Sequence, residues 1–140
     1  MISREEIRSI PIVDRSIKRK QEQLTYLREK ATSVPSGLTE GERVQSSVTN
    51  TAGYYIDAAS DLARIIRAEQ LELSDLQHRA EAFISTLESP LAIRILRYRY
   101  IDCLKWEMIA DLLGYSEDYL RQIERESVNN LLSPPLTQEV

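Results

Sequence analysis

The stretch that decides the fold is Trp106–Leu131, which lies within LKWEMIADLLGYSEDYLRQIERESVNNLL at positions 104–132. Its apolar residues recur at helical spacing on both sides of a glycine, which predicts two short amphipathic helices joined by a turn. Gly114 suits the left-handed residue that ends the first helix, and Ser116 is a good N-cap for the second. The stretch therefore predicts a helix-turn-helix, the motif that places its second helix, here residues 117–132, in a groove of DNA.

An ordinary helical hairpin inside a bundle is the alternative interpretation of this stretch. Such a hairpin would share the apolar spacing of Ile109, Leu113, Leu120 and Ile123. It would not require a small residue at position 110, where the helices cross, or a cap at position 116.

The second helix carries the candidate DNA-binding residues. By geometry, Arg121 suits the O6/N7 edge of a guanine and Gln122 the N6/N7 edge of an adenine, whereas Arg125 is better placed for a phosphate. The predicted DNA-binding set is Ser116, Tyr119, Arg121, Gln122 and Arg125. For each of them, simple solvation of the helix surface is the alternative.

The segment Tyr100 to Leu131 resembles region four of sigma-70-type sigma factors, whose recognition helix contains the run R-Q-I-E found here at positions 121–124. The chain also resembles the small phage and prophage regulators of late transcription (ArpU/RinA-type), through Arg99-Tyr100-Ile101, Trp106, Ile109-Ala110 and Leu113-Gly114-Tyr115-Ser116. These resemblances imply a phage-type transcription regulator that binds promoter DNA, with host RNA polymerase as a second partner.

The chain departs from the sigma pattern just after the cap. The usual basic residue there is replaced by Glu117, and Asp118 follows. Two acidic residues suit the positive end of a helix dipole but not a nearby DNA phosphate. They favour a second hypothesis, in which the protein is a helical adaptor that binds RNA polymerase or a sigma factor without reading DNA. A phage DNA-packaging component, assembled as a ring, is a weaker third hypothesis.

Composition favours an all-helical protein and excludes a sequence-blind DNA coat. Glycine and proline are scarce, charged residues make up 29%, and the formal net charge is −4. Charge is uneven: residues 1–34 hold eight Arg/Lys against five Asp/Glu, whereas residues 35–89 hold four against nine. A specific DNA reader can be acidic overall if its basic residues are clustered.

Two long helices are predicted before the motif. Ser3 and Glu6 have capping-box spacing in a short helical turn at residues 3–9, and Pro11 is expected in the first turn of a longer helix. After a linker at residues 32–49, a long central helix is expected from about Asn50 to about Leu87. Both helices carry heptad apolar stripes, so we expect an antiparallel, coiled-coil-like hairpin.

Each apolar stripe contains one charged residue at a core heptad position, Lys20 in the first helix and Glu69 in the second. In either antiparallel register they fall in neighbouring layers, so we predict that they pair and thereby fix the register. Outward snorkelling of both side chains is the alternative.

The fold expected is therefore all-α, with three parts. Residues 1–88 form the helical hairpin, residues 89–133 a three-helix domain that contains the motif, and residues 134–140 a flexible tail. Ser89 and Pro90 are expected to start the scaffold helix of that domain. Apolar positions beside the seam of the long helix leave room for a homodimer.

Nothing in the sequence indicates catalysis. We find no nucleophile–base set, phosphate-binding glycine loop or metal-ligand spacing, so no cofactor is expected and the protein is not expected to be an enzyme. Cys103 and His78 are the only residues of their types. No apolar run or signal-peptide pattern occurs, so we expect a cytoplasmic protein with no membrane partner.

Overall fold

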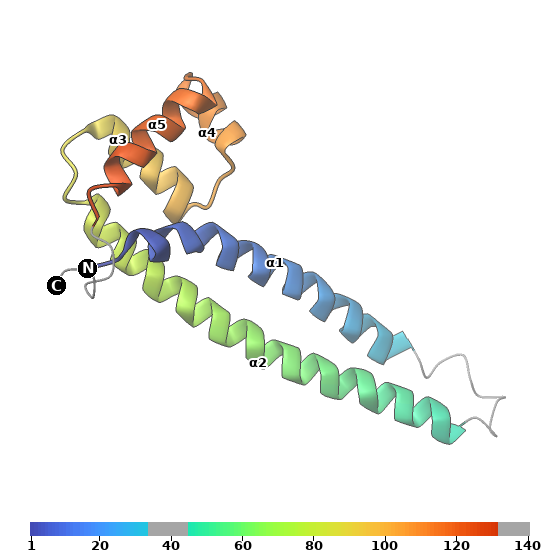
Figure 1. Ribbon diagram of the computed structural model, residues 1–140. Coiled ribbons are helices and arrows are strands. Elements are labelled where there is room, and N and C mark those ends of the chain that lie inside the picture. Colours follow the sequence, from blue (N-terminus) through green and yellow to red (C-terminus); the bar gives the residue numbers. More distant parts are fainter. Residues whose placement is uncertain (34–44, 132–140) are drawn as a thin grey trace. The chain divides into compact units, whose positions relative to one another are not determined.

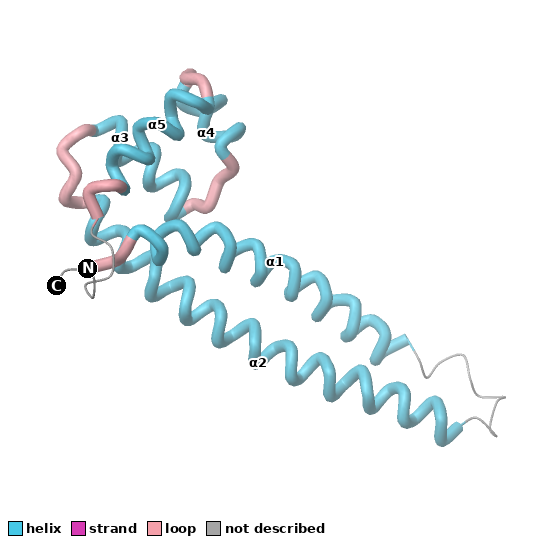
Figure 2. Tube along the Cα trace, viewed as in Figure 1, coloured by secondary structure: helices cyan, strands magenta, loops and turns pink. Residues whose placement is uncertain are grey.

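The protein is all-α, as expected. The computed structural model describes residues 1–33 and 45–131, and within these ranges it contains helices and loops but no strand (Figures 1 and 2). The helices are α1 (Arg4–Ser33), α2 (Gln45–Ile84), α3 (Pro90–Leu96), the π-helical turn η3 (Arg97–Ile101), α4 (Trp106–Leu113) and α5 (Glu117–Val128). None of the described helices is both long enough and apolar enough to span a bilayer.

The chain divides into two compact units that differ from the expected domains. Unit 1 combines Met1–Asp14 with Glu72–Val140, and unit 2 is Arg15–Leu71. The predicted boundary at residue 88 therefore does not separate the units, because the first turns of α1 and the last turns of α2 belong with the C-terminal helices. The predicted tail, residues 134–140, lies outside the described residues.

The start of α1 confirms the capping box. The Ser3 N–H donates to Glu6 Oε1 (3.0 Å), and the Glu6 N–H donates to Ser3 Oγ (3.1 Å). The predicted break before Pro11 is wrong, since α1 runs continuously from Arg4 to Ser33 with Pro11 inside it. Pro11 removes one backbone donor, but burial of the neighbouring Ile7 and Ile10 holds the helix together across it.

The long helix is shifted towards the N-terminus relative to the prediction. It begins at Gln45 rather than Asn50 and ends at Ile84 rather than Leu87. At its end, the Thr86 and Leu87 N–H groups donate to the carbonyls of Phe83 and Ile84, which turns the chain out of the helix. The linker predicted at residues 32–49 is therefore shorter, and residues 34–44 lie outside the described residues.

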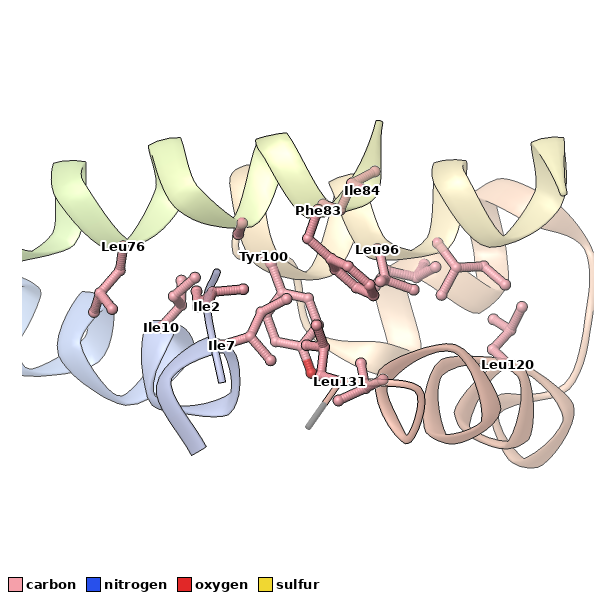
Figure 3. Packing of buried hydrophobic residues seen from close by; sticks show 14 residues of the cluster. Ile2, Ile7, Ile10, Leu76, Phe83, Ile84, Leu96, Tyr100, Leu120 and Leu131 are labelled. Carbon is pink, nitrogen blue, oxygen red and sulfur yellow. The ribbon is translucent and has the colours of Figure 1, made fainter. Parts of the chain in front are cut away.

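Unit 1 has one dense apolar core (Figure 3). The predicted three-helix domain is only part of it, because the N-terminal segment and α2 also contribute. The N-terminal segment supplies Ile2, Ile7 and Ile10, and α2 supplies Leu76, Ala80, Phe83 and Ile84. The remaining buried members are Ile95, Leu96, Tyr100, Ile109, Leu120, Val128 and Leu131. The helices α3, α4 and α5 therefore share one core with the start of α1 and the end of α2.

The start of α3 is as predicted. Ser89 caps the helix by accepting a hydrogen bond from the Ala92 N–H (3.2 Å), and Pro90 occupies the first turn. The scaffold helix does not stay α-helical, however, since it widens into η3. The Gln77 side-chain amide of α2 donates to the carbonyls of Tyr100 and Ile101, both at 3.0 Å, and so holds the end of this turn.

Unit 2 is a pair of helical segments with few buried residues. Among its described residues only Ile17, Ala59 and Ile66 are buried apolar side chains. The prediction that Lys20 and Glu69 pair is confirmed, with Lys20 Nζ 3.1 Å from Glu69 Oε2. The Ser16 hydroxyl also donates to Glu69, at 3.1 and 3.2 Å, and lies 2.5 Å from Lys20 Nζ. A polar cluster therefore occupies this layer of the seam.

Candidate nucleic-acid interface

Two helices meet at the turn that the sequence singled out. Gly114 has φ 78°, the left-handed conformation expected of the residue that ends α4, and its N–H donates to the Ala110 carbonyl (2.8 Å). Ser116 then caps α5 by accepting from the Tyr119 N–H (3.2 Å). Both local predictions are confirmed, and a side chain at position 114 would strain the turn.

The helices are held by apolar contacts on their inner sides. Ile109 of α4 and Leu120 of α5 are fully buried, and the small Ala110 is partly buried against the same core. Val128 closes the far end of α5. The helix stops there, so the predicted span of 117–132 is too long: the Leu131 N–H bonds to the Val128 carbonyl (2.9 Å) in a tight turn.

All five predicted DNA-binding residues are exposed to solvent, namely Ser116, Tyr119, Arg121, Gln122 and Arg125. They do not share one direction, because successive helical residues are rotated by about 100°. Asp118, Gln122 and Arg125 lie opposite the buried face, at the centre of the outward side of α5. Ser116 acts as the cap, and the Tyr119 ring packs against Tyr115 with centroids 5.1 Å apart.

Arg121 lies at the edge of the exposed face rather than at its centre. Its guanidinium is 5.6 Å from the ring centroid of Trp106 and forms an ion pair with Glu117 (3.3 Å). Gln122 Nε2 donates to Glu126 Oε2 (3.2 Å). Arg121 and Gln122, the two residues predicted to contact bases, thus both have partners within the protein. To contact a base, each would have to exchange that partner for DNA.

A buried polar cluster lies behind α5, and the sequence-based prediction missed it. Glu124 is only 6% exposed. Its carboxylate accepts a 2.5 Å hydrogen bond from the Tyr100 hydroxyl and two longer ones, at 3.4 Å, from the Arg8 guanidinium. The position of Glu124 between Leu120 and Val128, four residues from each, was the available signal that it belongs to the inner face.

The environment of Tyr100 keeps its hydroxyl protonated. Burial raises the pKa of the Tyr100 phenol, and the adjacent Glu124 carboxylate raises it further. The phenol therefore remains a hydrogen-bond donor to Glu124 throughout the neutral pH range. Arg8 supplies the compensating charge, so α1, η3 and α5 are joined through one carboxylate.

Exposed apolar and aromatic side chains lie on both sides of the Gly114 turn. Met108 and Leu112 are one turn apart on α4 and are 51% and 53% exposed. Tyr115 and Tyr119, after the turn, are 45% and 44% exposed, and their rings contact each other. Large apolar side chains left exposed in this number are a candidate surface for binding another molecule.

The described residues offer no arrangement for a metal ion. Across residues 1–33 and 45–131, no three His, Cys, Asp or Glu side chains come together at ligating distance. Cys103, in the turn before α4, has φ 57° and packs partly buried against the core of unit 1.

No protein-family model, curated protein or solved structure matches this chain significantly.

Proposed function

We propose that the protein is a DNA-binding transcription regulator that reads duplex DNA with the outward face of α5. The observation that carries the proposal is the pair α4 and α5, joined through the left-handed Gly114 and the Ser116 cap, with α5 exposed on one side. A helix presented in this way fits the major groove, where amide and guanidinium groups distinguish bases.

Gln122 is the residue best placed for base reading. It lies at the centre of the exposed face, and its amide can both donate to and accept from an adenine. Its internal partner is the exposed Glu126, and a hydrogen bond between exposed side chains exchanges easily for another. Arg125, next to it on the outward face, is placed to contact either a base or the sugar-phosphate backbone.

The test is selection of random duplex DNA on the purified full-length protein at near-physiological salt. We expect an enriched DNA motif with the wild-type protein. Gln122→Ala should remove the base preference at one position of that motif, a loss of about 1–3 kcal/mol in discrimination between bases. Gln70→Ala is the matched control, because Gln70 is exposed on α2 far from α5 in sequence. Absence of any enriched motif with correctly folded protein would reject the proposal.

A second candidate function is supported by the exposed side chains of Met108, Leu112, Tyr115 and Tyr119. An adaptor that binds RNA polymerase or a sigma factor would bury such side chains, and the acidic residues Glu117 and Asp118 lie in the same part of the sequence. Replacing Leu112 with Ser should abolish capture of purified polymerase in that case. The same substitution should leave DNA selection unchanged if reading by α5 is the function.

A further inference from the structure

Four arginines of unit 1 line one pocket, which the sequence did not reveal. The pocket has a volume of about 360 Å³. Its walls come from α1, η3, α4 and α5, and its lining includes Arg8, Arg99, Trp106, Arg121, Glu124 and Arg125. Four arginines therefore face one carboxylate, and that carboxylate is already bonded to Arg8 and Tyr100.

Two of these arginines are held in place before any ligand arrives. Arg99 donates to the Leu104 carbonyl (2.9 Å), and its guanidinium is 5.1 Å from the centroid of Trp106. Arg121 lies over the same ring, 5.6 Å from its centroid, and pairs with Glu117. Packing against an aromatic ring fixes the plane of a guanidinium, so the direction of its N–H groups is set by the protein.

Arg125 completes the pocket from the outward side of α5, where it is exposed. The pocket therefore has a local excess of positive charge, because Glu117 and Glu124 are two carboxylates beside four guanidinium groups. A planar fork of N–H donors matches the oxygens of a phosphate group, which can accept from two arginines at once.

We infer that this pocket binds a phosphate group through Arg99, Arg121 and Arg125. The source that the geometry favours is the DNA backbone, because two of the three arginines belong to α5, and in this respect the inference rests on the proposed function. It also changes the role of Arg121: this residue anchors a phosphate beside the groove, while Gln122 reads a base. Free phosphate, or the phosphate of a small molecule, shares the same chemistry and is the other source to be tested.

Trp106 provides a direct readout, because it is the single tryptophan of the chain and lines the pocket. Inorganic phosphate is added to the full-length protein at constant ionic strength while Trp106 emission is followed. We expect a saturable change that chloride does not reproduce. Arg125→Gln should weaken it about tenfold, since one charged donor is removed. Arg94→Gln, an equal charge change at an exposed site on α3, should leave it unaffected.

The second arm uses duplex DNA and the salt dependence of its affinity. Removing one protein–phosphate interaction should reduce the slope of log K against log salt by about 0.9. We expect this reduction for both Arg125→Gln and Arg99→Gln and none for Arg94→Gln. Arg99 lies outside the two helices of the motif, so its effect would be specific to the pocket. Thermal unfolding of each variant checks the fold, and Arg125→Gln carries the test if Arg99→Gln is unfolded.

The two arms separate the inference from the proposed function. If phosphate changed the Trp106 emission but DNA did not bind, the pocket would be a site for free phosphate or a small-molecule phosphate, and DNA reading would be rejected. DNA binding with unchanged Trp106 emission, and with the wild-type salt slope in both variants, would overturn the pocket and leave DNA reading intact. If neither ligand bound, both proposals would be rejected. A change of Trp106 emission with phosphate, together with the reduced salt slope of DNA binding in the variants, would support the DNA backbone as the source of the phosphate.

Discussion

The two units of this chain are built from the same two long helices but are stabilised in different ways. In unit 1 the start of α1 and the end of α2 pack into a shared core with α3, α4 and α5, and isoleucines such as Ile7 and Ile95 are completely buried. In unit 2 the same helices have only each other among the described residues, and their seam includes the polar cluster of Ser16, Lys20 and Glu69. The stability of a long helix therefore varies along its length, because each segment is stabilised by the residues that pack against it.

The largest effect is expected when the C-terminal helices are separated from this shared core. A fragment of residues 89–133, the domain that sequence alone suggested, lacks Ile2, Ile7, Ile10, Phe83 and Ile84. Each fully buried side chain contributes about 1.5–3 kcal/mol, so their loss should exceed the stability of a small domain. We expect the fragment to be unfolded by circular dichroism. A cooperative thermal transition like that of the full chain would contradict the composition of unit 1.

A sharper comparison uses two isoleucines of the same helix. Ile7 lies in unit 1 and is 0% exposed, whereas Ile17 lies in unit 2 and is 5% exposed. We expect Ile7→Ala to lower the free energy of unfolding by about 2–5 kcal/mol, because the enclosed site leaves a cavity. Ile17→Ala should lie at or below the low end of that range, because solvent can reach a two-helix seam. Denaturant unfolding measures both, and equal losses would remove the proposed difference.

The polar cluster of unit 2 should affect register more than stability. The Lys20 and Glu69 side chains are 27% and 25% exposed, so the pair contributes no more than about 1 kcal/mol. Lys20→Leu and Glu69→Leu each remove one partner of the ion pair and place an apolar side chain in the seam, which permits other registers and oligomers. Light scattering and amide hydrogen exchange would detect them. If both variants kept the wild-type oligomeric state and exchange pattern, the pair would have no role in register.

The smallest effect concerns acid, and it belongs to unit 1. The Arg79 guanidinium and the Ser3 N–H hold the pKa of Glu6 below its ordinary 4.5, and Arg97 does the same for the pKa of Glu81. A lowered folded-state pKa stabilises the fold above the unfolded value, and this contribution is lost as the pH falls through the folded value. Both carboxylates are partly exposed, so each accounts for less than about 1 kcal/mol.

Unfolding measured between about pH 3 and pH 7 checks this effect. Glu6→Gln and Glu81→Gln should lose stability at neutral pH and show a shallower decline in acid than the wild type. Glu88→Gln, at an exposed position, is the control. A wild-type acid profile in Glu6→Gln would show that its pairing with Arg79 contributes nothing to stability.

The helices and their boundaries follow largely from local sequence. Ser3 with Glu6, Ser89 with Pro90, and Gly114 with Ser116 form the caps that their spacing predicted. Local hydrogen bonds of this kind need only neighbouring residues, which explains why they could be predicted. The predicted break at Pro11 failed for the opposite reason: burial of Ile7 and Ile10 outweighs one missing backbone donor.

The DNA-binding role of the five candidate residues stays a prediction, and their arrangement could not be predicted. All five candidate residues are exposed, as a DNA-reading role requires. The sequence could not show that Arg121 lies over Trp106, or that Arg8 and Arg99 join it around one pocket. These contacts depend on how α1, η3 and α5 come together.

By itself, then, the sequence determined that the chain is helical, where the capped helices α1, α3 and α5 start and where α4 ends, and which face of α5 meets solvent. Periodicity and capping carry that information, because they act within a few residues. Only the tertiary structure decided that the N-terminal isoleucines complete the C-terminal core. It alone also placed Arg8 against Glu124, 116 positions away along the chain. Contacts across such separations are set by the packing of whole helices, which no local pattern specifies.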